Sequence, residues 1–419
     1  MSPLTLAGAR TAVTVDPPVV LAPMAGVTNV PFRAVCRAFS DTARLRRDGG
    51  PLYVSEMVGA RALVEADQRG AMALLRTDDG SLDAESDKAR LADELSGGRL
   101  RTMLRAAFAP DEPVRSLQLY AIDPDHMRDG VAVLAEYDLV DHIDLNFGCP
   151  APKVTRMGGG AALPWRLGLF AELVEAAVST AGGRPVTVKM RKGIDADHLT
   201  FLEAGRIARD LGVAAVTLHG RTAQDAYGGH ADWDAIAALV DAIGDEVPVL
   251  GNGDIWQAAD AVEMIARTGC AGVVVGRGCL GRPWLFGELE AALAGRPVPP
   301  PPNLGQVADT LLDHATKLVD HLGEAVAMRD IRKHTGWYLQ GFELGKTLRG
   351  ALRRVERLEE MADLLGTVDR EAPMPESAVS MHRGHTHGPK PVRLPDGWLD
   401  SRDTHTRLPA AAGAVVSGG

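Results

Sequence analysis

Residues 247–278 read VPVLGNGDIWQAADAVEMIARTGCAGVVVGRG, and this stretch contains the repeating unit of the predicted fold. A short apolar run ends in Gly-Asn-Gly, a longer Ala-rich segment follows, and a second apolar run ends in Gly-Arg-Gly. Apolar residues at three- and four-residue steps indicate a helix, whereas short β-branched runs bounded by glycines indicate buried strands. The stretch therefore predicts a strand, a helix and a second strand parallel to the first.

The same alternation recurs along the chain. Eight short apolar runs are predicted strands: residues 19–24, 53–58, 114–120, 142–148, 185–190, 214–220, 247–253 and 272–278. Residues 167–181, 201–211 and 235–243, between the later runs, have helical spacing. Eight strands, most followed by a helix, predict an α/β fold of the (β/α)8 TIM-barrel type within about residues 15–290. A doubly wound open sheet is the competing architecture, but it does not require eight strands.

Composition limits the class of protein. The chain has 419 residues, of which 46% are hydrophobic, so it is too apolar to be disordered. No apolar run reaches the roughly 18 residues of a membrane span, and residues 1–18 lack a secretory signal, so we expect a cytoplasmic protein without membrane association. The four cysteines include no CxxC pair and are not expected to form a disulfide scaffold or a metal site. The net charge of −10 argues against coating of nucleic acid, though not against a local basic face.

The predicted organisation has four parts: a barrel over residues 1–295 with an acidic insertion at about 76–112, a Pro-rich linker over 296–303, a small all-helical domain over 304–368 and a disordered tail over 369–419. Residues 78–112 carry nine acidic and five basic side chains. Helical spacing predicts helices near residues 304–322, 325–339 and 344–365. The His-rich piece at 381–387 is expected to be solvated rather than to bind a metal.

Polar and small residues stand at the C-terminal ends of the predicted strands, where TIM barrels carry their chemistry. They are Pro23, Met24 and Ala25; Gln118; Asn146 and Cys149; Lys189 and Arg191; His219 and Arg221; Asn252, Gly253 and Asp254; and Gly276 and Arg277. The two Gly-rich turns after the last strands can bring backbone N–H groups close to a phosphate. Glycines serve tight turns equally well, but two adjacent turns with Arg277 favour phosphate binding.

Three of these side chains have alternative explanations. Lys189 ends an apolar strand and needs either a structural ion-pair partner or an anionic ligand such as the edge of a reduced flavin. His219 can be a satisfied buried histidine, or it can grip an anion together with Arg221. Cys149, with an ordinary thiol pKa of about 8.5, would be mainly protonated at neutral pH and able to donate a proton. A nucleophilic thiolate is the rival role, but no Cys–His–Asn order supports it.

Several motifs together resemble the tRNA-dihydrouridine synthase family, most closely its bacterial B-type branch. They are LAPMAGVTNVPFR at 21–33, DLNFGCPAPKV at 144–154, VKMRKG at 188–193, LHGRT at 218–222, GNGDI at 251–255, GRGCLGRPWLF at 276–286 and MRDIRKHTGWYLQGF at 328–342. Their order and spacing match over the predicted barrel and the first helices after it.

The resemblance implies an FMN-dependent enzyme that is reduced by NADPH and then reduces the C5=C6 bond of uridines in tRNA. Hydride would pass from flavin N5 to C6, and Cys149 would protonate C5. The resemblance places Pro23, Met24, Ala25, Gln118, Lys189, His219, Asn252, Gly253, Asp254, Gly276 and Arg277 at the flavin, and Asn146, Lys153, Arg191 and Arg221 at the uridine or its backbone. No obligate protein partner is implied.

A basic segment in the helical domain is a candidate for binding the tRNA backbone. Residues 329–357 contain eight Lys or Arg against three Asp or Glu, and Arg332 and Lys333 lie within it. Two other functions compete with the one that the resemblance implies. A flavin-dependent reductase or dehydrogenase of a free pyrimidine would not need this basic domain. A tRNA-binding chaperone with a relic flavin site would not need Cys149, Lys153 and Lys189.

Overall fold

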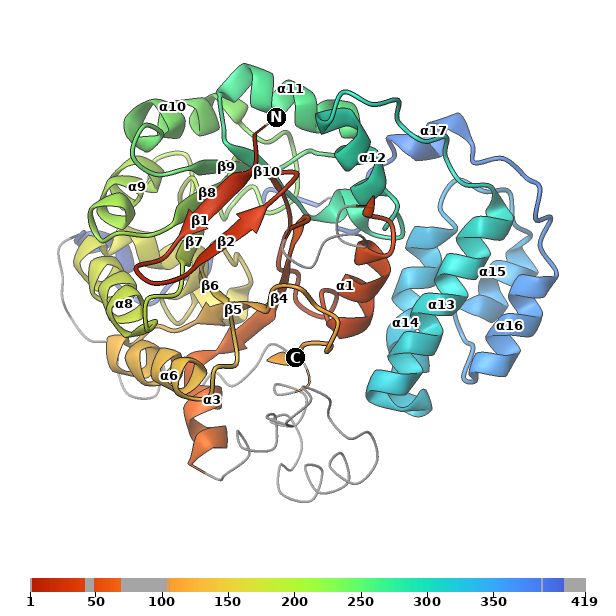
Figure 1. The fold of residues 1–419 in the computed structure, drawn as a ribbon, viewed down its shortest axis with the longest axis horizontal. Helices are drawn as coiled ribbons and strands as arrows, with labels where there is room; N and C mark the ends of the chain where they lie inside the picture. Colours follow the sequence, from red (N-terminus) through yellow and green to blue (C-terminus); the bar gives the residue numbers. More distant parts are fainter. Residues whose placement is uncertain (1, 42–48, 69–103, 105, 386, 403–419) are drawn as a thin grey trace.

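The predicted TIM barrel is present. The computed structural model describes residues 2–41, 49–68, 104, 106–385 and 387–402. Eight parallel strands close in the order β10-β3-β4-β5-β6-β7-β8-β9 (Figure 1). They are β3 (Val19–Leu21), β4 (Leu52–Gly59), β5 (Ser116–Tyr120), β6 (His142–Phe147), β7 (Val186–Arg191), β8 (Ala215–His219), β9 (Val249–Asn252) and β10 (Gly272–Val275). The competing open sheet is therefore excluded.

A helix follows each barrel strand and covers the outside of the barrel (Figure 1). These helices are α1 (Val30–Arg37), α3 (Ala60–Asp67), α6 (Pro124–Glu136), α8 (Leu167–Thr180), α9 (Phe201–Asp210), α10 (Trp233–Ile243), α11 (Ala258–Thr268) and α12 (Leu285–Leu293). Helix α11 shows how the sequence sets the boundaries. Gln257 and Asp260 form a reciprocal capping box at its start, and Gly269 ends it at φ 69°.

An N-terminal hairpin that the sequence analysis did not predict covers one end of the barrel. Strands β1 (Leu4–Ala7) and β2 (Ala12–Val15) pair antiparallel, and buried and exposed residues alternate along them. The buried side chains Leu4, Leu6, Val13 and Val15 join a cluster with residues of the barrel strands such as Val274. The hairpin thereby closes the end of the barrel opposite the C-terminal ends of the strands (Figure 1).

The predicted helical domain follows a mainly exposed segment over residues 296–302. It contains α13 (Leu304–Leu322), α14 (Glu324–Tyr338), α15 (Lys346–Leu352) and α16 (Leu358–Gly366), which share a buried core. The single helix predicted at 344–365 is wrong, because α15 and α16 are separate. The Arg332 guanidinium donates to the carbonyls of Val355 (3.0 Å) and Arg354 (3.2 Å) and thereby stabilises the break.

The tail prediction is wrong for residues 369–402. This part includes helix α17 (Glu376–Val379), and Trp398 is buried against Ala162 and Ile194 on the barrel. The Trp398 indole N–H donates to the carbonyl of Ala162 at 3.0 Å. This Pro- and Gly-rich segment is held by a few separate contacts and not by a regular apolar face, so hydrophobic periodicity does not predict that it is ordered. Residues 403–419 lie outside the described part of the chain.

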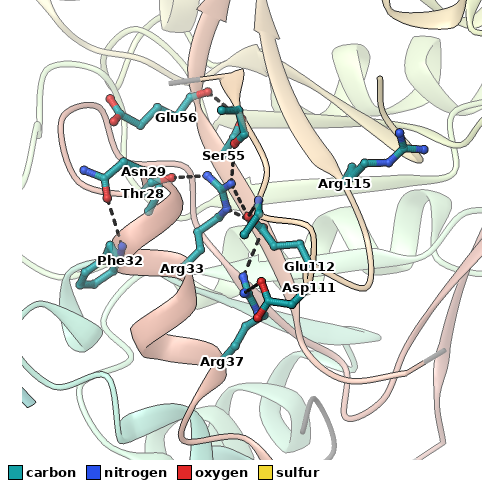
Figure 2. Close-up of polar contacts among 12 residues, drawn as sticks. Thr28, Asn29, Phe32, Arg33, Arg37, Ser55, Glu56, Asp111, Glu112 and Arg115 are labelled. Carbon is teal, nitrogen blue, oxygen red and sulfur yellow. Dashed lines mark hydrogen bonds and ion pairs between the residues drawn. The ribbon is translucent and has the colours of Figure 1, made fainter. Parts of the chain in front are cut away.

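The acidic insertion predicted at about 76–112 lies mostly outside the described residues, but its end has a structural role. Glu112 accepts two hydrogen bonds from Arg33, at 2.8 and 2.7 Å, and both side chains are buried (Figure 2). Arg33 also donates to the carbonyls of Thr28 (2.9 Å) and Ala107 (2.8 Å). It therefore ties the end of the insertion to the loop between β3 and α1, which carries Pro23, Met24 and Ala25.

Candidate active site

A cavity of about 860 Å³ opens at the C-terminal ends of the barrel strands. Its wall includes Pro23, Met24, Ala25, Gln118, Asn146, Cys149, Lys189, Arg191, His219, Asn252, Gly253, Asp254, Gly276, Arg277 and Lys333, all predicted from the sequence as site residues. Helix α14 contributes Lys333 and Trp337, so the helical domain forms part of the rim. The convergence of the strand ends explains why residues distant in sequence share one wall.

Three predicted site residues do not line this cavity. Arg221 is buried and donates to Asp254 (2.7 Å) and to the carbonyls of Gly228 and Gly229. Arg332 donates to the carbonyls of Arg354 and Val355, in the segment between α15 and α16. Lys153 lies in the short helix α7 (Pro152–Thr155), near enough to Cys149 for its charge to lower the pKa of that thiol.

A chain of hydrogen bonds fixes the turn that carries Cys149. Gln118 Nε2 donates to Asp144 (2.7 Å), and Asn146 Nδ2 donates to Gln118 Oε1 (2.7 Å). Asn146 Oδ1 in turn accepts from the backbone N–H groups of Gly148 (3.2 Å) and Cys149 (3.0 Å). Sequence reasoning found Gln118 and Asn146 but missed Asp144. Its position two residues before Asn146 in a strand was the available signal, because alternate strand residues share a face.

Burial controls the charge states at the centre of the site. It raises the pKa of the Asp144 carboxyl to about 6 and lowers that of the Lys189 ammonium to about 8, because each charged form loses its water. Lys189 Nζ donates to Asn252 Oδ1 at 2.9 Å, which fixes its direction. Burial, with the positive charges of Arg191 and Lys189, holds the pKa of His219 well below its usual range. His219 is therefore neutral at pH 7.

The Cys149 thiol is neutral as well. Burial raises its pKa, while the Ala151 N–H and the charges of Arg191 and Lys153 oppose that rise. Behind the cysteine, Gly160 has φ +55°, and a Cβ there would lie 2.4 Å from the Cys149 carbonyl oxygen. Only glycine fits this position, so the backbone around the thiol is tightly packed. The site thus presents a fixed, protonated thiol.

The end of the cavity beside β9 and β10 suits an anion. Gly253 has φ +120°, and a Cβ there would lie 2.9 Å from the His219 ring. Arg277 is 13% exposed, and burial followed by the charge of Arg221 lowers its pKa to about 10. Asp254 binds Arg221 at 2.7 Å but lies 3.9 Å from Arg277. Positive charge is therefore in excess at this end.

These features define the class of protein. A TIM barrel with an anion site after its last two strands, and a lysine and a neutral thiol beside it, has the arrangement of an enzyme that binds a phosphate-bearing cofactor. A family model described as "Dihydrouridine synthase (Dus)" matches residues 20–83 and 92–373. The chain belongs to this family, whose members are flavin-dependent oxidoreductases, and it is an enzyme of that kind. The resemblance seen in the motifs is confirmed.

Named relatives agree with the family match. A probable tRNA-dihydrouridine synthase of Mycobacterium tuberculosis (strain H37Rv) is 50% identical over 404 residues, which cover 96% of this chain and 94% of the relative. One from Mycobacterium leprae is 49% identical over 418 residues, covering 95% and 100%. The tRNA-dihydrouridine synthase B of Xanthomonas axonopodis is 35% identical over 347 residues, covering 82% and 90%. The family model ends at residue 373, so the tail lies beyond it.

None of the helices among the described residues is long and apolar enough to cross a membrane. Within the same residues, no group of three or more His, Cys, Asp or Glu side chains is placed to hold a metal ion.

Proposed function

We propose that this chain is a cytoplasmic tRNA-dihydrouridine synthase that reduces the C5=C6 bond of uridines in tRNA, with FMN as cofactor and NADPH as reductant. The observation that carries the proposal is the presence in one cavity of an anion site and of a fixed, protonated thiol, Cys149. The names of the relatives support the choice of tRNA uridine as substrate.

The residues at the cavity fit FMN. The excess positive charge at Arg277 and the Gly253 turn suit a phosphate dianion. Lys189, held by Asn252, suits the electron-rich edge of a reduced flavin. Pro23, Met24 and Ala25 would line the cofactor on the loop that Arg33 fixes. When bound, the flavin supplies the hydride that reduces C6 of the uridine.

The chain itself supplies the proton. Cys149 Sγ–H donates its proton to C5 of the uridine, so one hydride and one proton together saturate the C5=C6 bond. The resulting thiolate regains a proton from water. Asn146 holds the backbone N–H groups of the Cys149 turn, and Gln118 holds Asn146, so the thiol keeps a constant position through the reaction.

The uridine must leave its base stack to reach this cavity. Such flipping costs a few kcal/mol, which contacts elsewhere on the RNA must offset. Lys333 is placed for such a contact, since it lines the cavity at the rim, where it donates to the Gly26 carbonyl at 2.5 Å and pairs with Asp330, a partner that an RNA phosphate would replace. This basic rim favours tRNA over a free pyrimidine.

Incubation with NADPH and unmodified tRNA, with free uracil in parallel, tests the proposal through a mass gain of two hydrogens at defined uridines. Turnover of uracil alone would contradict it.

Arg332 and Lys333, both predicted to bind tRNA, provide a matched pair for a second test. Lys333→Ala should raise the KM for tRNA about three- to tenfold, because one phosphate-binding cation is lost, and should leave NADPH oxidation unchanged. Arg332→Ala removes a side chain that caps the carbonyls of Arg354 and Val355. It should lower the unfolding temperature more than Lys333→Ala does. Steady-state kinetics with purified tRNA measure the first effect, and thermal unfolding measures the second. Unchanged tRNA kinetics for Lys333→Ala would show that Lys333 does not bind tRNA.

The pH profile tests the proton donor. Because burial raises the pKa of Cys149, the thiol stays protonated through neutral pH and ionises only as the pH rises further. The loss of single-turnover uridine reduction that comes from thiol ionisation, starting from reduced enzyme, should therefore begin only above the ordinary thiol pKa, separate from the earlier change expected as Lys189 loses its proton near pH 8. Lys153→Ala removes a charge that lowers this pKa, so the decline should move to higher pH. A rate that rises with pH across this range would indicate a reactive thiolate instead.

A further inference from the structure

The tail forms part of the cavity wall, although it lies beyond the residues that the family model matches. We call residues 381–385 and 387–392 the C-terminal strap. Its backbone joins the loop after β8, because the N–H of Lys390 donates to the carbonyl of Gln224 (2.8 Å) and the N–H of Tyr227 donates to the carbonyl of His387 (3.4 Å). Six residues of the strap line the cavity: Gly384, His385, His387, Lys390, Pro391 and Val392.

The strap contacts Arg277 in two ways. Arg277 Nη1 donates to the carbonyl of His385 at 2.6 Å. The Arg277 guanidinium also lies over two rings, 4.8 Å from the centre of the Tyr227 ring and 5.0 Å from that of Trp256. The His382 ring in turn stacks on Trp256 at 4.2 Å with an interplanar angle of 17°. Through His382, the strap therefore packs against Trp256, one of the two rings that contact Arg277.

The positive charge of Arg277 is not fully balanced by a neighbouring carboxylate, so an anion can bind there. Asp254, the nearby carboxylate, pairs closely with Arg221 and only distantly with Arg277. Arg221 is 1% exposed, does not line the cavity and is already paired with Asp254. Arg277 does line the cavity and lies 3.9 Å from the same carboxylate, so its charge is incompletely paired. Arg277 thus points to a ligand with negative charge.

We propose that the C-terminal strap positions Arg277 for the phosphate of the flavin, with His382 supporting the stack and the His385 carbonyl fixing the guanidinium. The proposal rests on the proposed use of FMN. His382 and His385 are positioning residues, because they act through Arg277 rather than on the cofactor. An arginine already held in its binding orientation loses little side-chain freedom when the phosphate binds, so affinity for the phosphate rises.

Riboflavin carries the same ring system as FMN without the phosphate. A comparison of the two affinities therefore distinguishes an effect on phosphate binding from a general effect on packing around the flavin. Flavin-free, full-length protein would be titrated with FMN and with riboflavin by flavin fluorescence. We expect His382→Ala to weaken FMN binding about five- to tenfold and riboflavin binding less than about twofold. His382→Phe keeps a ring on Trp256 and should restore FMN binding. Arg393→Ala, at an exposed position just after the strap, is the matched control and should change neither affinity.

A double-mutant cycle tests whether His382 acts through Arg277. Arg277→Ala should weaken FMN binding, and His382→Ala should add less than about twofold in that background. Equal weakening of FMN and riboflavin by His382→Ala would overturn the positioning role. Unchanged FMN affinity with a raised KM for tRNA would overturn it too and assign the strap to RNA. Wild-type protein that binds neither flavin would instead overturn the proposed function, and this inference with it.

Discussion

Replacing Cys149 by alanine is expected to lower dihydrouridine formation by about 10²- to 10⁴-fold, the usual contribution of a positioned general acid. The thiol is fixed by Asn146 and kept protonated by burial, and alanine cannot donate a proton. In a single turnover without tRNA, NADPH should still be oxidised at the wild-type rate as it reduces the bound flavin, because that half of the reaction does not use the thiol. Mass spectrometry of digested tRNA and absorbance of NADPH measure the two halves separately.

Another buried cysteine provides the control for this experiment. Cys270 is 2% exposed and does not line the cavity, so Cys270→Ala removes a thiol without touching the chemistry. It should retain the wild-type rate per folded molecule. Dihydrouridine formation by Cys149→Ala at the wild-type rate would show that the proton at C5 comes from another group.

Loss of Glu112 is expected to cost the protein about 3–5 kcal/mol of stability, the range for breaking a buried ion pair from one side. Arg33 has a fully buried side chain and directs its donors to Glu112, Thr28 and Ala107 (Figure 2). In Glu112→Ala the guanidinium remains buried without its carboxylate. Urea unfolding followed by circular dichroism measures the loss.

The neighbouring Asp111 is a close control. It pairs with Arg37 at 3.0 Å, but its side chain is 78% exposed. Asp111→Ala should therefore cost less than about 1 kcal/mol, as is usual for exposed ion pairs. Similar losses in the two variants would show that burial of the Arg33–Glu112 pair has little energetic consequence. Because Arg33 also fixes the loop that carries Met24, Glu112→Ala should weaken flavin binding in the fraction that remains folded.

The barrel could be predicted from sequence because its signal is repeated. Each strand is a short apolar run that ends in small or polar residues, and eight such runs specify the closed sheet. The N-terminal hairpin was missed because its strands have only four residues each, although their alternation was readable. The order in the tail could not be predicted, since it depends on a few separate long-range contacts, such as that of Trp398 with Ala162 more than two hundred residues away. Overall composition does not show single contacts of this kind.

The site was predictable at the level of which residues meet, but less so for what each contacts. Strand ends converge by geometry, so Cys149, Lys189 and Asn252 reach one cavity as expected. The sequence does not show whether an arginine faces a ligand or a backbone carbonyl. Arg221 binds carbonyls and Asp254 instead of lining the cavity, and Arg332 binds carbonyls between two helices.

The hairpin β1–β2 has a consequence for the order in which the chain is made and folded. Its strands leave the ribosome before the barrel strands do, and their partners Ala214, Leu250 and Val274 are synthesised about two hundred residues or more later. Contacts between such distant residues form slowly, because a long loop must close before they can form. Leu4, Leu6, Val13 and Val15 thus lack their final neighbours until the last barrel strand has been translated. The hairpin, made before the barrel strands, is thus among the last parts of the barrel to reach its place.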